Sequence, residues 1–331
     1  MFHRLLSFVL LLTLFTTAVA EEARLDDRFQ FPKQGHFELL YSIHIEVKGL
    51  SLKSEADVLA LQKRIEAIPF DEERITSHKL LIDLGLQRIE RPLPTPRPGV
   101  TNFRRLPDWR EMTVSFDEDR FIQTDKADNL SSIYAASPYG EVQVTRSPTN
   151  TQANHYGLRR RPNVARVDVG QILSRVGIDR AQAYQVETQD DREVLILSEN
   201  IKYFAFPKRD LITARLSGMP AGPIYSASLQ FYHERPTKTD GIWMPRLTMN
   251  IRRKSRDSCR VQFYIIRKAE LDKPPEDKDF RVPLYRGDTY VSDESEQRYV
   301  VRMPMTLTDI LDKPPSLVRD LIEHERRNPG P

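Results

Sequence analysis

Alternation of apolar and polar residues is the feature that most restricts the fold of this chain. Between Phe37 and Val47, apolar side chains occupy every second position. The same period of two returns at 112–116, 225–231, 247–251 and 261–266. This period places apolar side chains on one face of a β-strand and polar side chains on the other. Short turns such as Asp240-Gly241 between alternating segments favour an antiparallel sheet with one dry face.

A few segments have helical spacing instead. Val58, Leu61 and Ile65 fall on one helical face, and Ser54 with Asp57 forms a capping box that predicts a helix from Ser54 to Ile68. A shorter apolar stripe predicts a helix between Asp168 and Gly177, and Leu317, Val318, Leu321 and Ile322 predict another near the C-terminus. The predicted fold class is therefore α+β and mostly β, with a curved antiparallel sheet and a few helices.

The N-terminus has the pattern of a secretory signal. Met1 to Ala20 contains a short basic start, an apolar run from Leu5 to Phe15, and the small-residue ending Ala18-Val19-Ala20. We expect residues 1–20 to be cleaved on export. No later segment approaches the ~18 apolar residues of a membrane-spanning helix. The mature chain is therefore predicted to lack a transmembrane span.

The rest of the chain is predicted to form one sheet domain with short appendages. Residues 21–36 are charged and irregular, and 37–310 form the antiparallel-sheet domain. Alternate prolines at 91–99 predict a stiff extended connector within it. Residues 311–331 form a C-terminal helix and tail.

Composition excludes several function classes. The formal net charge is only +3, which gives no reason to expect nucleic-acid binding. Glycine is scarce, with 13 residues in 331, and no glycine-rich loop precedes a helix, so nucleotide binding is not expected. Cys259 is the one cysteine, so no internal disulfide can form. Arg252, Arg253, Lys254 and Arg256 form a basic cluster that fits either a hairpin loop or a contact with an anionic membrane surface.

Motifs for catalysis are lacking in the sequence. No two histidines have the i, i+4 spacing of a helical zinc site, and Ser226 and Ser228 lack the glycines of a nucleophile elbow. We therefore predict no enzyme activity, no metal and no cofactor. A hydrolase would require two or more of the following residues to converge in one pocket: His44, His155, His233, Asp117 and Glu141.

The apolar face of the sheet is the candidate ligand-binding surface. Such a face either packs against helices as a closed core or curls around a space that holds an apolar ligand. The sequence favours neither outcome. The large side chains expected on this face are Phe116, Tyr225, Phe231, Trp243, Met249 and Phe263.

Several short motifs in the C-terminal half resemble one family. They are Asp240-Gly241-Ile242-Trp243-Met244-Pro245, Asp279-Phe280-Arg281-Val282-Pro283, Gly287 to Asp293, and Tyr299-Val300-Val301. In this order they resemble exported bacterial proteins of the LolA-like superfamily, which includes outer-membrane lipoprotein carriers and localisation factors. The resemblance covers roughly residues 105–305 and implies a half-barrel with helices on its concave face. It carries over no catalytic residue.

These observations lead to one functional expectation and one alternative. The resemblance implies a periplasmic or cell-envelope protein of a bacterium that binds a lipid acyl chain or a lipidated partner in the half-barrel. The alternative is a closed-core structural module that binds envelope protein partners. An apolar hollow open to solvent would support the first interpretation, and a filled sheet face would support the second.

Overall fold

The computed structural model describes residues 23–24, 32–89, 108–127, 130–147, 151–156, 169–174, 183–189, 192–206, 211–218, 222–292, 298–301 and 310–327. The predicted signal at 1–20, most of the segment 21–36 and the proline-rich connector at 91–99 lie outside the described residues.

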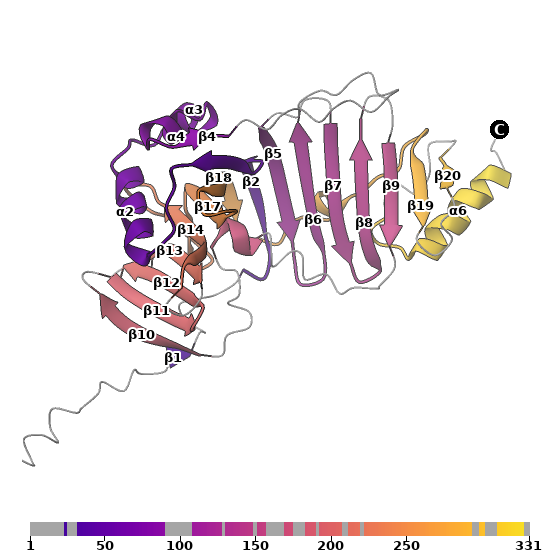
Figure 1. Cartoon of the computed structure of the whole chain (residues 1–331). Helices are drawn as coiled ribbons and strands as arrows, with labels where there is room; N and C mark the ends of the chain where they lie inside the picture. Colours follow the sequence, from indigo (N-terminus) through magenta and orange to yellow (C-terminus); the bar gives the residue numbers. More distant parts are fainter. Residues whose placement is uncertain are drawn as a thin grey trace, which may run out of the picture.

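One large sheet dominates the described part of the chain (Figure 1). Its strands are β1 (Ala23–Arg24), β2 (Gly35–Ser42), β3 (Ile45–Lys48), β4 (Gln87–Arg88), β5 (Trp109–Phe116), β6 (Phe121–Ala127), β7 (Leu130–Ser137), β8 (Gly140–Arg146), β9 (Thr151–Tyr156), β10 (Ala183–Gln189), β11 (Arg192–Ser198), β12 (Ile201–Phe206), β13 (Leu211–Gly218), β14 (Ile224–Phe231), β17 (Leu247–Arg253), β18 (Ser258–Glu270), β19 (Thr289–Ser292) and β20 (Arg298–Val300). A separate small hairpin joins β15 (Lys238–Thr239) and β16 (Ile242–Trp243).

Strand pairing is almost entirely antiparallel. The spatial order is β1-β10-β11-β12-β13-β14-β17-β18-β2-β5-β6-β7-β8-β9-β19-β20, and β3 and β4 continue beside one end of β18. Of the pairs described, β9–β19 is the parallel one. The predicted curved, mostly antiparallel sheet with a few helices is confirmed.

The first alternating segment is two strands and not one. The sequence predicts a continuous strand from Phe37 to Val47, but the ladder breaks after Ser42 and resumes at Ile45. The backbone N–H of Ile43 donates to the carbonyl of Asp108 at 2.8 Å, outside the β18 ladder. The two intervening residues change which positions face which side, so Phe37 and Val47 belong to different hydrophobic clusters.

The sheet has two faces, which we name by what covers them. The helix face carries Val261, Phe263 and Ile265 of β18 and is covered by α2 (Glu55–Glu66), α3 (Glu72–Thr76) and α4 (Lys79–Asp83). Over β6–β9 the same face is covered by η2 (Asp277–Phe280), the chain that follows it, and α6 (Pro315–Arg327). Figure 1 shows this orange segment crossing behind the strands.

The turn face is the opposite side of the sheet. Residues 169–172 form a short helical turn, and the chain to Ser174 packs against this face. In Figure 1 the turn lies beside β17, in the angle between that part of the sheet and β5–β9.

The helices follow their sequence signals. In α2, Ser54 accepts a hydrogen bond from the backbone N–H of Asp57, and the Asp57 carboxylate accepts one from the N–H of Ser54. This reciprocal pair is the predicted capping box. In α6, Val318 and Ile322 are buried as predicted, but Leu317 is 44% exposed. None of the helices in the described part of the chain is both long and apolar enough to cross a membrane.

Candidate functional site

An apolar strip runs along the middle of the turn face. It is built by alternate residues of β2 and β5, where Phe37 stacks on Phe116 with ring centroids 6.2 Å apart. Tyr41 and Tyr264 stack in the same way at 6.2 Å. The other members that the sheet contributes to the strip are Leu39, Met112, Val114, Phe121 and Ala136, with Tyr134 and Ile266 partly buried against them.

The turn at 169–174 covers this strip with three side chains. Val169, Ile172 and Leu173 are each at most 1% exposed and belong to the same hydrophobic cluster as the strip. These three side chains cover the turn face, whereas α2, α3 and α4 cover the helix face. The cover that the turn provides is therefore much smaller than the layer formed by α2, α3 and α4.

Polar side chains of the sheet form hydrogen bonds with both the backbone and the side chains of the turn. Thr248 Oγ1 donates to the carbonyl of Ile172 at 2.7 Å, and the Tyr264 hydroxyl donates to Gln171 Oε1 at 3.3 Å. Ser228 donates to Asn250 Oδ1, so the 2.5 Å contact between Ser174 and Ser228 has Ser174 as donor. These contacts satisfy buried polar groups at the turn that would otherwise cost stability.

A pocket of about 410 Å³ opens on the turn face beside the turn. Gln171 and Ser174 form its border with the turn, and residues of β14, β17 and β18 line the sheet side. Its lining residues are His44, Gln171, Ser174, Arg215, Tyr225, Ser226, Ala227, Ser228, Asn250, Ile251, Arg252, Arg260 and Gln262. Three arginines and no carboxylate stand in this lining.

A buried polar cluster lies at the other border of the strip. The Tyr41 hydroxyl and the Asp125 carboxylate share a hydrogen bond, and Arg110 lies beside Tyr41. Burial, helped by the nearby Asp125 charge, raises the pKa of Tyr41 to about 12. Burial also raises the pKa of Asp125, against the opposing effect of hydrogen bonds from Gln123, Tyr41 and Ser132.

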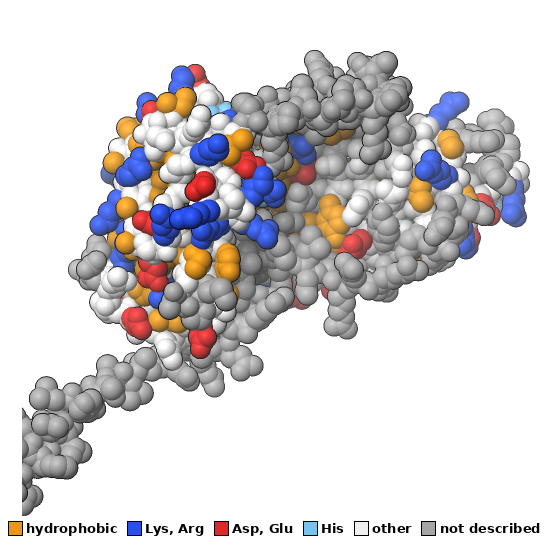
Figure 2. Space-filling view, in the orientation of Figure 1, with side chains coloured by type: hydrophobic (Ala, Val, Ile, Leu, Met, Phe, Trp, Pro, Cys, Tyr) orange, Lys and Arg blue, Asp and Glu red, His pale blue; other side chains and the backbone are white. Residues whose placement is uncertain are grey.

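Beyond this cluster the turn face is mostly polar, and Glu141 of β8 adds one carboxylate to it. Gln123, Tyr134, Gln143 and Asn154 form one row across β6–β9 by strand register. Gln143 is exposed and the other three are half-buried. Figure 2 shows this part of the face as a hollow whose floor is largely white, with an orange patch. The apolar strip is therefore followed on this face by a polar hollow.

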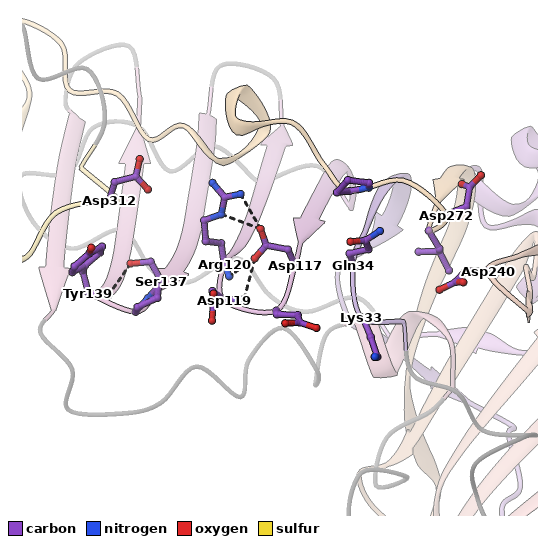
Figure 3. Close-up of a pocket in the computed structure, with 14 residues that line it drawn as sticks. Lys33, Gln34, Asp117, Asp119, Arg120, Ser137, Tyr139, Asp240, Asp272 and Asp312 are labelled. Atoms are coloured by element: carbon purple, nitrogen blue, oxygen red, sulfur yellow. Dashed lines mark hydrogen bonds and ion pairs between the residues drawn. The ribbon is translucent and has the colours of Figure 1, made fainter.

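A larger pocket of about 680 Å³ lies at the edge of the sheet, by the turns after β5 and β7 (Figure 3). One of the acidic residues that line this pocket is Asp117. Its carboxylate forms an ion pair with Arg120 at 2.9 Å and accepts hydrogen bonds from the backbone of the turn. Arg120 also pairs with Asp277 at 3.0 Å. These contacts close a turn and join it to η2. In the described part of the chain, no group of three or more His, Cys, Asp or Glu residues is placed to hold a metal ion.

The six predicted ligand-binding residues do not share one surface. Phe231, Met249 and Phe263 lie in the core under the helix face, each at most 4% exposed. Phe116 lies in the apolar strip of the turn face. Tyr225 is half exposed at the pocket rim, and Trp243 belongs to the small hairpin, where Lys238 packs over its ring at 4.7 Å.

The residues that a hydrolase would need are also distributed. His44 lines the pocket on the turn face, whereas His155 is buried beneath the helix face against the Tyr290 hydroxyl at 3.1 Å. His233 packs edge-on against Phe70, and Asp117 closes the turn after β5. Glu141 follows the β7–β8 turn.

No family model matches the sequence, and no curated protein sequence matches it either. Solved structures that are similar include a LolA superfamily protein from Nitrosomonas europaea, with a TM-score of 0.34, 12% identity, and coverage of 77% of this chain and 94% of that one. A second similar structure is a DUF1329 family protein from Desulfovibrio piger, with a TM-score of 0.35, 10% identity, and coverage of 82% of this chain and 94% of that one.

A third similar structure is an outer membrane lipoprotein-sorting protein domain from Vibrio parahaemolyticus, with a TM-score of 0.31, 8% identity, and coverage of 52% of this chain and 81% of that one. Because the TM-scores are all below 0.5, the superpositions give no residue-by-residue correspondence.

Proposed function

We propose that this protein is a non-catalytic binding protein that holds the acyl chain of a lipid or of a lipidated partner on the turn face. The observation that carries the proposal is the thin cover over the apolar strip. Among the described residues outside the long strands, Ile242 and Met244 by the small hairpin and Leu271 after β18 also belong to this cluster. The rest of the cover is three apolar side chains of one short turn, Val169, Ile172 and Leu173. A ligand that replaces those side chains would find an apolar surface already formed by the sheet.

The energies involved make such an exchange feasible. Burial of an acyl chain contributes about 0.8 kcal/mol for each methylene, so a chain of about 12 methylenes contributes roughly 10 kcal/mol. Burial of Val169, Ile172 and Leu173 contributes roughly 1.5–3 kcal/mol each. A long acyl chain therefore offsets the loss of the turn from the strip.

The expected export of the chain supports the same role. A signal at residues 1–20 would deliver the protein to the cell envelope of a bacterium, where lipids and lipidated proteins are the abundant apolar ligands. We propose that the protein works there after removal of the signal.

Native mass spectrometry of protein purified without detergent tests the proposal. We expect a stoichiometric lipid or lipopeptide adduct, either after purification or after incubation with phospholipid. Tyr134→Ala removes a half-buried ring of the turn face and should lower adduct occupancy. Ile133→Ala is the matched control, because Ile133 is adjacent and half-buried but packs against the helix face.

Two results would contradict the proposal. One is a clean apo mass that stays unchanged after incubation with phospholipid. The other is an equal loss of adduct in both variants, which would place the lipid elsewhere. The first result would favour the closed-core interaction module and turn the search to protein partners, and the second would remove the turn face as the binding surface.

A further inference from the structure

The pocket beside the turn contains an unusual arrangement of arginines. Arg252 and Arg260 are directly opposite each other on the neighbouring strands β17 and β18, with side chains on the same face. Arg215 lies on β13, in the next row along the strands. Like charges directly opposite on adjacent strands destabilise a sheet. The Arg252–Arg260 pair is therefore locally unfavourable, and locally unfavourable pairs of this kind are expected mainly at functional sites.

We propose that this pocket binds the phosphate group of the ligand whose acyl chain lies on the apolar strip. The inference rests on the proposed function and specifies the class of ligand: an anionic phospholipid or another phosphate-bearing amphiphile. Arginine is suited to this role because its planar guanidinium donates two parallel hydrogen bonds to phosphate oxygens. A bound phosphate would also remove the repulsion between Arg252 and Arg260.

The remaining lining provides further donors and a suitable size. Ser226, Asn250 and Gln262 contribute hydroxyl and amide groups. The Nε–H of Arg260 is buried and has no hydrogen-bond partner. A volume of about 410 Å³ lies within the range of small-molecule sites and accommodates a glycerophosphate head.

On the other edge of β18, Arg260 lies opposite Glu46 of β3. Glu46 does not line the pocket, and its carboxylate forms an ion pair with Lys254 at 2.5 Å. The positive charge on the pocket side is therefore not balanced by a carboxylate in the lining.

The pocket and the strip are adjacent, because one segment borders both. Gln171 and Ser174 line the pocket, while Val169, Ile172 and Leu173 of the same turn cover the strip. Asn250 Nδ2 donates to the carbonyl of Gln171 at 3.3 Å and joins the two regions. A phosphate in the pocket would therefore place the start of an acyl chain at the end of the strip.

The test compares lysophosphatidic acid with a monoacylglycerol of the same acyl chain, using the full chain and equilibrium binding. We expect lysophosphatidic acid to bind at least about tenfold more tightly, since one charged hydrogen bond lost corresponds to about one factor of ten. Arg252→Gln and Arg260→Gln should each remove most of that preference and leave monoacylglycerol binding unchanged. Arg256→Gln is the matched control, because Arg256 is exposed in the β17–β18 turn and does not line this pocket.

The outcomes separate this inference from the proposed function. Equal binding of both ligands would overturn the phosphate site while leaving the acyl site intact. Binding of neither ligand would overturn both. Competition by inorganic phosphate at concentrations that leave monoacylglycerol bound would support the pocket and identify free phosphate as a second source. Loss of the preference in Arg256→Gln as well would show a general charge effect and overturn the site.

Discussion

Tyr41 is the residue whose surroundings give the clearest pH effect. Its folded-state pKa of about 12 exceeds the ordinary value near 10, because burial and the Asp125 charge disfavour the phenolate. The folded protein therefore holds this proton more tightly than the unfolded chain. The resulting stability is fully present below about pH 10 and is lost as the pH rises toward 12.

We predict that Tyr41→Phe reduces this alkaline loss. Between about pH 9 and about pH 11, the free energy of unfolding should fall by about 1 kcal/mol less in the variant than in the original protein. Urea unfolding at the two pH values measures the difference. The same decline in both proteins would mean that Tyr41 titrates normally.

Individual residues also show where sequence reasoning stops. The alternation correctly predicts that Met249 and Phe263 share a dry face, because parity within one strand or hairpin is local. It does not predict that Phe116 faces the other side, because that depends on how β5 registers with β2. Arg215, Arg252 and Arg260 meet only through the pairing of four strands, so the sequence signal near Arg252 indicated a basic hairpin and not a pocket.

Among the elements, α2 depends on a defined N-terminal cap. The Ser54 hydroxyl and the Asp57 carboxylate satisfy backbone donors of the first turn. Ser54→Ala should therefore lower the free energy of unfolding by about 1 kcal/mol. Urea denaturation of the original protein and the variant measures this difference in the free energy of unfolding. Lys53→Ala is the control, since Lys53 contributes only its backbone N–H to Asp57, and an unchanged midpoint for Ser54→Ala would show that the cap contributes little.

Element prediction succeeded where a signal was carried within the segment itself. The capping box and apolar stripe located α2, and Asp240-Gly241 located the turn of the small hairpin. β9 was missed, because Thr151–Tyr156 is mostly polar and is held by its pairing with β8 and β19. The break between β2 and β3 was missed because the apolar alternation continues through residues 43 and 44. The ladder of hydrogen bonds to β18, by contrast, is interrupted there.

At the scale of the whole molecule, β18 joins the two parts of the sheet. It pairs with β17 along one edge and with β2 and β3 along the other. Cys259 lies where both edges are paired, opposite Arg253 and Val47, and is 2% exposed. Burial raises the pKa of its thiol, so little thiolate is present in the folded protein.

Cys259 should therefore report the opening of the central strand. We predict that a disulfide-exchange reagent leaves Cys259 essentially unlabelled in native buffer, and that labelling accelerates in parallel with global unfolding by urea. Absorbance of the released thiolate measures the rate, with fully denatured protein as the fast reference. Stoichiometric labelling of the native protein within the mixing time would show that β18 opens independently of the rest.

The long-range pairing of β2 with β18 has a consequence for how the nascent chain matures. Tyr41 finds its partner Tyr264 only after most of the polypeptide has emerged, whereas β5 to β9 are neighbours in both sequence and space. Hairpins such as these form early, and distant pairings form late. One edge of the first long strand therefore stays open through synthesis, and an open edge invites the wrong partner. We therefore expect this edge of β2 to benefit from protection until β18 has been synthesised.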